Sequence, residues 1–190
     1  MGIAKTVLET IHLLALGLCA GVTAAIGVTA AIAFPTMRDL DPALPAYASY
    51  TGEHWMIAAG SIMNRAFTVG DWVTLVCVLL AFLTLAIGGI TGAIRIGSMT
   101  GVLRSCAVAA CAALVCITFI SMRPEMNDAL RTYWDAAAIG NNDVADAAKT
   151  RFQSMHPKAS FMLVTTLVLS VLAFVFGAAN ALAPAEERTP

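Results

Sequence analysis

The chain has 190 residues, of which 59% are hydrophobic and only 12% are charged, and its formal net charge is −1. A water-soluble domain carries about a quarter charged residues, so this composition excludes an ordinary soluble protein. The near-neutral charge gives no electrostatic basis for binding nucleic acid.

Four apolar stretches have the length, or nearly the length, of a membrane-spanning helix, which needs about 20 residues. In lipid, the backbone N–H and C=O groups of each stretch must be hydrogen-bonded within the protein, and these sequences have the pattern of α-helices. The predicted spans are 7–34, 72–94, 104–122 and 159–182. The sequence therefore predicts an all-α protein: an integral membrane, up-down four-helix bundle that forms a single domain over 1–190.

The first predicted span opens with Glu9 and His12, which lie three residues apart and hence on one helical face. There the carboxylate could hold the imidazole or share a metal with it. Cys19 and Thr23 continue this face, and Asn180 returns to the same membrane side near the end of the fourth span. Glu9, His12 and Asn180 are therefore candidate site residues, with snorkelling at the interface as the alternative.

The first helix is expected to stop at Pro35, because the residue before a proline resists the α conformation. After it, no proline occurs between Ala46 and Met122. Segment 46–70 is therefore predicted to be mostly helical outside the membrane, with entry at Trp72. A break at Gly70 with Asp71 as N-cap is the competing prediction.

A polar stripe follows the second helix, where Asn64, Thr68, Asp71 and Thr74 recur on one face. Arg65 could pair with Asp71 only if the helix broke between them, because six residues is the wrong spacing. Asn64 and Asp71 are therefore candidate residues of a water-filled pocket. The alternative is that they only pack against polar groups of neighbouring helices.

The third span ends near Pro124, where the helix either kinks or starts again with the proline at its first position. Two amphipathic segments follow within 124–156, separated by the turn "GNND". They predict a helical hairpin outside the membrane, between spans three and four, so that the helices extend beyond the bilayer.

His156 precedes Pro157 at the entrance of the fourth span. The pair reads either as a helix-start signal or as a ligand or proton-carrying group at the membrane surface. A metal, if there is one, would use His12 or His156, but these enter from opposite faces, roughly 30 Å apart, and cannot share one ion. A haem would need a single histidine, or His156 with His54.

Sulfur-containing residues are numerous. The nine methionines allow a copper site near the hairpin, although methionine is also ordinary core filler. The five cysteines all lie within predicted spans and are expected to behave as small hydrophobic residues: Cys19, Cys77, Cys106, Cys111 and Cys116.

Orientation is predicted from the basic residues beside short loops. The connection 95–104 carries two arginines and no acidic residue, which favours cytoplasmic termini. The raw count of basic residues on the two sides favours the opposite orientation.

Four motifs resemble those of a known family: "IHLLALGLCAG", "AFP", the proline at 124 and "RFQSMHPKAS". Together they resemble bacterial four-span membrane proteins related to human transmembrane protein 205, an uncharacterised family. Its Phe-x-x-x-His-Gly-x-Ser motif is matched by Phe152, His156 and Ser160, with Pro157 in place of the glycine. The resemblance implies His12 and His156 as characteristic polar positions and a bacterial inner-membrane location, but no reaction.

A second stretch, "ITFISMRPEMNDAL", is similar to the Pro-x-Asn-x-x-Leu segment of anthrone-oxygenase-like four-span proteins, with Asn127 one residue later than in that pattern. A more distant likeness, to copper-resistance and haem-handling four-helix membrane proteins, rests on His12 alone.

No complete catalytic constellation is visible in the sequence. We therefore expect a non-enzymatic membrane protein that handles a small molecule or a metal, or an accessory subunit of a membrane complex. The alternatives are a membrane oxidoreductase, anthrone-oxygenase-like or haem-linked, and a homo-oligomeric pore. The expected partners are the lipid bilayer and a second copy or complex subunit; no cofactor is expected, with haem or copper as alternatives.

Overall fold

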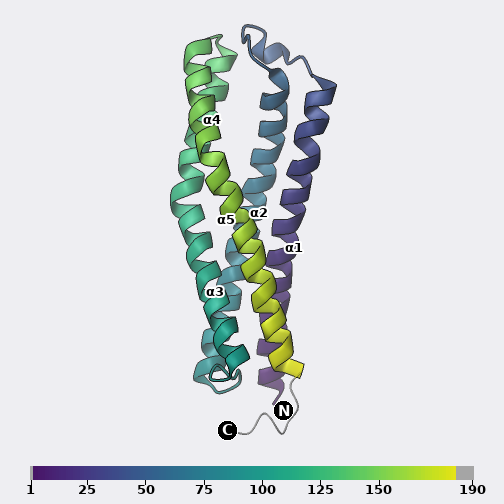
Figure 1. The fold of residues 1–190 in the computed structure, drawn as a ribbon, viewed down its shortest axis with the longest axis vertical. Coiled ribbons are helices and arrows are strands. Elements are labelled where there is room, and N and C mark those ends of the chain that lie inside the picture. Colours follow the sequence, from purple (N-terminus) through teal and green to yellow (C-terminus); the bar gives the residue numbers. More distant parts are fainter. Residues whose placement is uncertain (1, 183–190) are drawn as a thin grey trace. The chain divides into compact units, whose positions relative to one another are not determined.

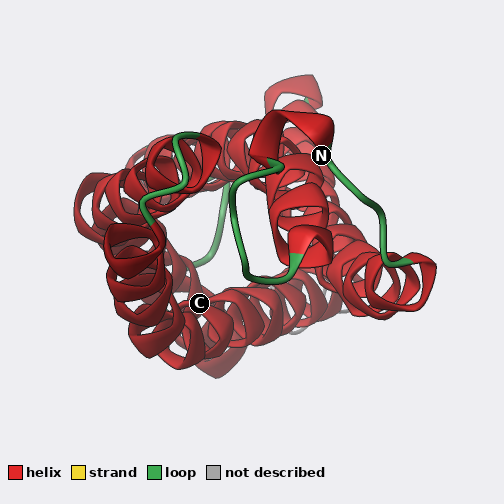
Figure 2. Ribbon diagram, turned by 90° about the horizontal axis from the view of Figure 1, so that it is seen from above, coloured by secondary structure: helices red, strands yellow, loops and turns green. Residues whose placement is uncertain are grey.

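The computed structural model describes residues 2–182, and every regular element in that range is helical. Helix α3 continues through a π-helical turn, η2, into α4, which gives four long helical stretches joined by short loops (Figures 1 and 2). This confirms the predicted all-α, four-helix membrane bundle. The elements are α1 (Ile3–Leu40), the 3-10 turn η1 (Pro45–Tyr47), α2 (His54–Ile90), α3 (Met99–Ile117), η2 (Thr118–Met122), α4 (Arg123–Ala138) and α5 (Asn142–Leu182).

Each of the four helical stretches is long and apolar enough to cross a membrane, with lengths of 38, 37, 40 and 41 residues. At a rise of 1.5 Å per residue, 40 residues cover about 60 Å, roughly twice the hydrocarbon thickness of a bilayer. By length and composition the chain is thus an integral membrane protein whose helices exceed the bilayer core.

Prolines do not end the helices where the sequence predicted. Helix α1 continues through Pro35, and α5 begins at Asn142 and continues through Pro157. The predicted stop at Pro35 and the predicted helix start at His156-Pro157 are both wrong. A proline inside a membrane helix is tolerated where neighbouring groups satisfy the freed backbone.

Pro124 has a different effect. It sits in the first turn of α4, directly after the π-helical turn η2. The proline lacks an N–H and its ring crowds the carbonyl four residues earlier, and the wider π turn accommodates this without breaking the helix. The predicted hairpin follows, and it turns at Gly140, whose φ of 74° suits a glycine.

Helix α2 also runs on unbroken past Gly70 and Asp71, so the predicted break with Asp71 as N-cap is wrong. The helix ends at Ile90, in a turn that contains Gly92 with φ of 69°. Helix α3 then starts beside Ser98, whose hydroxyl accepts the Gly101 N–H at 3.1 Å.

The described chain divides into two compact units, and each of the four helical stretches contributes to both. The first unit comprises 2–24, 72–116 and 164–182, and the second comprises Ala25–Asp71 and Ile117–Leu163. Each unit has its own buried core. The single domain over 1–190 that the sequence predicts stays a prediction.

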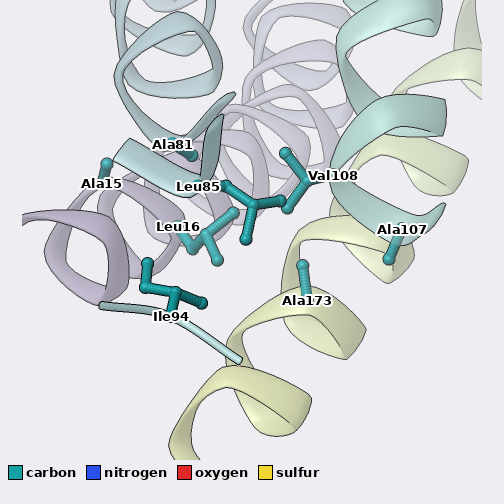
Figure 3. Close-up of a cluster of buried hydrophobic side chains, with 8 residues drawn as sticks. All are labelled: Ala15, Leu16, Ala81, Leu85, Ile94, Ala107, Val108 and Ala173. Atoms are coloured by element: carbon teal, nitrogen blue, oxygen red, sulfur yellow. The ribbon is translucent and has the colours of Figure 1, made fainter. Parts of the chain in front are cut away.

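The core of the first unit consists of small and branched apolar side chains from α1, α2, α3 and α5, together with Ile94 from the turn after α2 (Figure 3). Gly88 makes room for Ile94, since a Cβ on the glycine would clash with that side chain. The cluster is Ala15, Leu16, Ala81, Leu85, Ile94, Ala107, Val108 and Ala173.

The second unit packs the loop after α1 against α4 and α5. The Tyr133 hydroxyl donates to the Tyr50 hydroxyl at 3.3 Å, and the two rings meet edge to face. Asn142 accepts the Thr51 N–H at 3.0 Å, which ties the loop to the start of α5. The main buried apolar cluster of this unit is Tyr50, Ile57, Tyr133, Ala136, Ala137, Ala145 and Ala148.

Candidate functional site

Two helix faces in the first unit combine apolar packing with ionisable groups. Their residues recur at intervals of three and four, the helical spacing that places side chains on one side. The buried face of α1 consists of Glu9, His12, Ala15, Leu16, Cys19 and Thr23. The buried face of α3 consists of Gly101, Arg104, Ala107, Val108, Cys111 and Val115.

Arg104 joins the polar groups of these two faces. Its side chain is fully buried, and its two terminal nitrogens donate to the two Glu9 carboxylate oxygens at 3.2 and 2.7 Å. The Arg104 Nε–H donates to His12 Nε2 at 3.0 Å. The planar guanidinium thus uses its fixed fork of donors on a carboxylate and an imidazole at once. We call Glu9, His12 and Arg104 the buried cluster.

These contacts fix the tautomer of His12. An arginine N–H can only donate, so Nε2 of the imidazole must present its lone pair and carries no proton. The ring proton therefore sits on Nδ1, which donates to the Ala81 carbonyl oxygen at 2.9 Å and to Thr84 Oγ1 at 3.0 Å. His12 is a neutral imidazole with both nitrogens in hydrogen bonds.

Helix α5 leaves space for the buried cluster at Gly177. A Cβ at this position would lie 2.9 Å from Leu13 Cδ2 and 3.3 Å from Arg104 Nε. Any larger residue would press on the guanidinium. The absence of a side chain at Gly177 therefore belongs to the geometry of the cluster.

A hollow with a volume of about 190 Å³ adjoins the buried cluster on the Glu9 side. It lies in the first unit, between the start of α1, the turn after α2 and the end of α5. Asn180, which the sequence associated with Glu9 and His12, lines the same hollow and donates from Nδ2 to the Arg95 carbonyl at 3.4 Å. The lining consists of Lys5, Thr6, Glu9, Thr10, Leu13, Arg95, Asn180 and Ala181.

Deeper in the first unit, two cysteines meet a serine. Cys19 Sγ and Cys111 Sγ lie 3.2 and 3.6 Å from Ser170 Oγ, whose own proton goes to the Thr166 carbonyl at 2.7 Å. The serine oxygen therefore accepts from the thiols. All five cysteines are free thiols in this structure.

Asn64 and Asp71 lie in the second unit, on α2. The partner of Asp71 is Arg123 of α4, with which it forms an ion pair, and Arg123 also donates to Thr68 Oγ1 at 3.2 Å. The Oδ1 atom of Asn64 is buried without a hydrogen-bond partner, as is that of Asn127 on α4. Of the stripe predicted on α2, Thr68 and Asp71 thus contact α4 through Arg123.

The two remaining histidines serve different purposes. His54 Nδ1 accepts the Leu44 N–H at 3.0 Å, so its Nε2–H is the donor toward the Tyr50 carbonyl at 3.3 Å. His54 therefore holds the loop after α1 through hydrogen bonds that use both of its ring nitrogens. His156 is exposed on α5, with its ring against Phe152 at a centroid distance of 5.8 Å.

Among residues 2–182, no group of three or more His, Cys, Asp or Glu side chains is arranged to hold a metal ion. A metal or haem at His12 would have to displace the Arg104 hydrogen bond or the Nδ1 proton. The methionines near the hairpin pack instead into an apolar cluster, in which Met126 and Met155 are buried around Ala129.

Two arginines were missed by reasoning from sequence. Arg104 was counted only as a basic residue flanking a loop, and Arg123 was not considered. Arg104 could have been found from its register, because Ala107, Val108 and Cys111 follow it at the spacing of one helical face. Arg123 has no comparable signal, since its partner is distant in sequence.

Comparison of the chain with models of protein families, with curated proteins and with solved structures finds no match. The resemblances to the proteins related to transmembrane protein 205 and to anthrone-oxygenase-like proteins therefore stay hypotheses. The chemistry of the buried cluster and its hollow is the basis for assigning a function.

Proposed function

We propose that this chain is a non-enzymatic membrane protein that handles a small molecule in the hollow beside the buried cluster. The observation that carries the proposal is that Glu9 belongs to both: it is ion-paired with Arg104 and it lines the hollow. Ionisable residues within membrane helices are costly, and they commonly mark the path or pocket of a ligand.

The size of the hollow limits its occupant. Its volume of about 190 Å³ is below the roughly 300–1,000 Å³ of pockets for drug-sized ligands. This supports a small solute, or one polar group of a larger molecule.

Six of the eight lining residues carry a polar group, including two hydroxyls and an amide, although most of the surface that they present to the hollow is apolar. A ligand with several hydrogen-bond acceptors would suit them. The engagement of both His12 nitrogens supports this assignment over a metal-handling or haem-linked oxidoreductase role that uses His12.

Filling the hollow tests the proposal. Thr10 is exposed and lines the hollow, and Thr10→Leu would occupy part of it. The matched control is Thr29→Leu, an exposed threonine of the same helix in the second unit. The thermal unfolding midpoint of detergent-purified protein would be measured with acetate, inorganic phosphate, glycerol 3-phosphate or choline.

We expect at least one of these solutes to raise the midpoint of the wild type and of Thr29→Leu, but not of Thr10→Leu. A ligand at 100 times its dissociation constant adds about 2.7 kcal/mol to the free energy of unfolding. Equal responses of the two variants, or no response to any solute, would contradict a ligand site in the hollow. The accessory-subunit role would then be the better proposal.

We further propose that the protein resides in the bacterial inner membrane with both termini in the cytoplasm. The motifs shared with bacterial four-span proteins support the first part, and the two arginines of the connection 95–104 support the second. A second copy of the chain, or a subunit of a membrane complex, is the proposed protein partner.

A further inference from the structure

Four buried side-chain atoms in the described part of the chain lack a hydrogen-bond partner, and all four belong to α2 or α4. They are Asn64 Oδ1, Asp71 Oδ2, Asn127 Oδ1 and Trp134 Nε1. The Asp71 atom is nevertheless ion-paired with Arg123 Nε, without the geometry of a hydrogen bond. Buried polar atoms without a partner are costly and rare in native proteins, so the concentration of these atoms on two helices needs a physical reason.

Contacts at two levels of the second unit fix how α2 and α4 face each other. At one level, Arg123 pairs with Asp71 and donates to Thr68. At the other level, a Cβ on Gly60 would lie 3.7 Å from the indole ring of Trp134. The contacts follow opposite orders in the two helices and are equally far apart in both. The helices therefore run antiparallel along one continuous contact, which we call the polar seam.

The two asparagines lie between these contacts, on the facing sides of the helices. Asn64 follows Gly60 by four residues and precedes Asp71 by seven, and Asn127 has the same spacing to the contact residues of α4. This spacing keeps side chains on one helical face. The antiparallel register places the two asparagines three residues apart, or about 4.5 Å along the axis. Their unpartnered oxygens are therefore neighbours.

The chemistry of the unpartnered atoms limits what can satisfy them. The two amide oxygens need a hydrogen-bond donor, whereas the indole N–H of Trp134 needs an acceptor. A cation would serve only the oxygens, and an anion would serve only the N–H. A hydroxyl group both donates and accepts. A buried water molecule typically makes about three hydrogen bonds to groups of this kind.

We propose that the polar seam is a binding site for a row of water molecules, which links Trp134, Asn64 and Asn127 and ends at the ion pair of Asp71 with Arg123. One water that donates two hydrogen bonds of about 2.8 Å spans about 4.5 Å, the axial separation of the asparagines. The ion pair directly precedes the predicted span 72–94, so the row brings water to the edge of the membrane. This site lies in the second unit and does not depend on the proposed function of the hollow.

A crystal structure that shows ordered water tests the proposal directly. We expect separate density peaks within hydrogen-bonding distance of Asn64 Oδ1, Asn127 Oδ1 and Trp134 Nε1. Continuous density that joins these atoms would identify a small polyol and overturn water as the occupant, while keeping a site for hydroxyl groups. A direct hydrogen bond between the two side-chain amides, with no density beside the indole, would overturn the site.

Nuclear magnetic resonance of detergent-purified protein gives a second measurement. The chain has three tryptophans, and Trp134→Phe identifies which indole signal belongs to Trp134. We expect a cross-peak between this indole proton and bound water in the wild type. The double variant Asn64→Leu with Asn127→Leu should lose it. A wild type without the cross-peak, or a double variant that keeps it at full intensity, would overturn the proposed row.

The sign of a stability change gives a third measurement, because leucine has nearly the size of asparagine but no oxygen. If water satisfies the oxygens, Asn64→Leu and Asn127→Leu each lose a buried hydrogen bond. Each thermal unfolding midpoint should then lie about 2–4 °C below that of Thr132→Leu. This control is an exposed position of α4 with a similar change in helix propensity. If the oxygens have no partner, leucine removes an unsatisfied group. A midpoint equal to or above that of the control, for either variant, would therefore contradict the proposal.

Discussion

Arg104 is held by three hydrogen bonds, two to Glu9 and one to His12. Burying an ion costs several kcal/mol even after relaxation, and the attraction of its partner offsets this only in good geometry. The net contribution of the pair to stability can therefore be small. The loss of one partner is different, because it leaves the other charge buried and unpaired.

Glu9→Gln is therefore expected to lower the free energy of unfolding by about 3–5 kcal/mol. The double variant Glu9→Leu with Arg104→Met should lose clearly less than either of its single changes, because it leaves no buried charge. Denaturant unfolding in mild detergent, followed by circular dichroism, measures both. Glu53→Gln, at an exposed position, serves as the control and should stay within about 0.5 kcal/mol of the wild type. A double variant as unstable as the singles would refute this energetic account.

Gly177→Ala tests the space that α5 leaves for Arg104. The added Cβ would press on Leu13 and on the guanidinium, and overpacking of this kind costs about 1–3 kcal/mol. At Gly21 a Cβ would meet nothing within 4 Å, so Gly21→Ala should gain up to about 1 kcal/mol from helix propensity. Thermal unfolding midpoints compare the two, and equal midpoints would show that Gly177 makes no room.

Local spacing was enough to place Glu9 and His12 on one face of a helix. It could not supply Arg104, which is 92 residues away from His12 in sequence, because spacing reports on one helix at a time. The sequence suggested that the Glu9 carboxylate could hold the His12 imidazole directly. In the structure Arg104 lies between the two side chains and donates to both.

Among the helices, the prolines were the least predictable feature. The rule that a helix ends before a proline reflects a steric conflict that costs about 3 kcal/mol in a helix interior. In lipid, however, a broken helix would expose several unsatisfied backbone groups, which costs more. Pro35 and Pro157 each lie within two residues of a predicted span, and α1 and α5 continue through them as helix.

Pro157→Ala distinguishes a proline inside a helix from one at its start. Inside α5, alanine restores an N–H and removes a ring clash, so stability should rise by about 1–3 kcal/mol. Pro45 begins the short turn η1, where proline is favourable, so Pro45→Ala should lower stability by about 0.4–1 kcal/mol. Thermal unfolding of both variants gives the two signs. A loss for Pro157→Ala would indicate a helix that starts at this residue.

For the molecule as a whole, composition and apolar length were sufficient to predict the four-helix membrane bundle. These properties are summed over about 20 residues per span, so single errors at helix ends do not alter the result. The division into two units and the pairing of Asp71 with Arg123 were not predictable, because they depend on contacts between distant segments.

Membrane orientation gives a prediction for the intact protein. Ile139→Cys lies at the turn before α5 and is 79% exposed, whereas Gly97→Cys lies in the connection before α3. With cytoplasmic termini, a membrane-impermeant maleimide should label Ile139→Cys in intact cells and Gly97→Cys only after permeabilisation. The reverse pattern would show the opposite orientation. Labelling of both from one side would mean that the α3–α4 stretch does not cross the membrane.

The π-helical turn at Thr118–Met122 has a consequence for the history of the chain. A π turn holds one residue more than the α-helix it interrupts. Loss of a single residue there would leave regular α-helix, with the side chains before and after it still facing the same way. Elsewhere in α3 or α4 the same loss would rotate every later side chain by about 100°, the angle between successive residues at 3.6 per turn. Natural variation in length within this stretch should therefore accumulate first at these five positions.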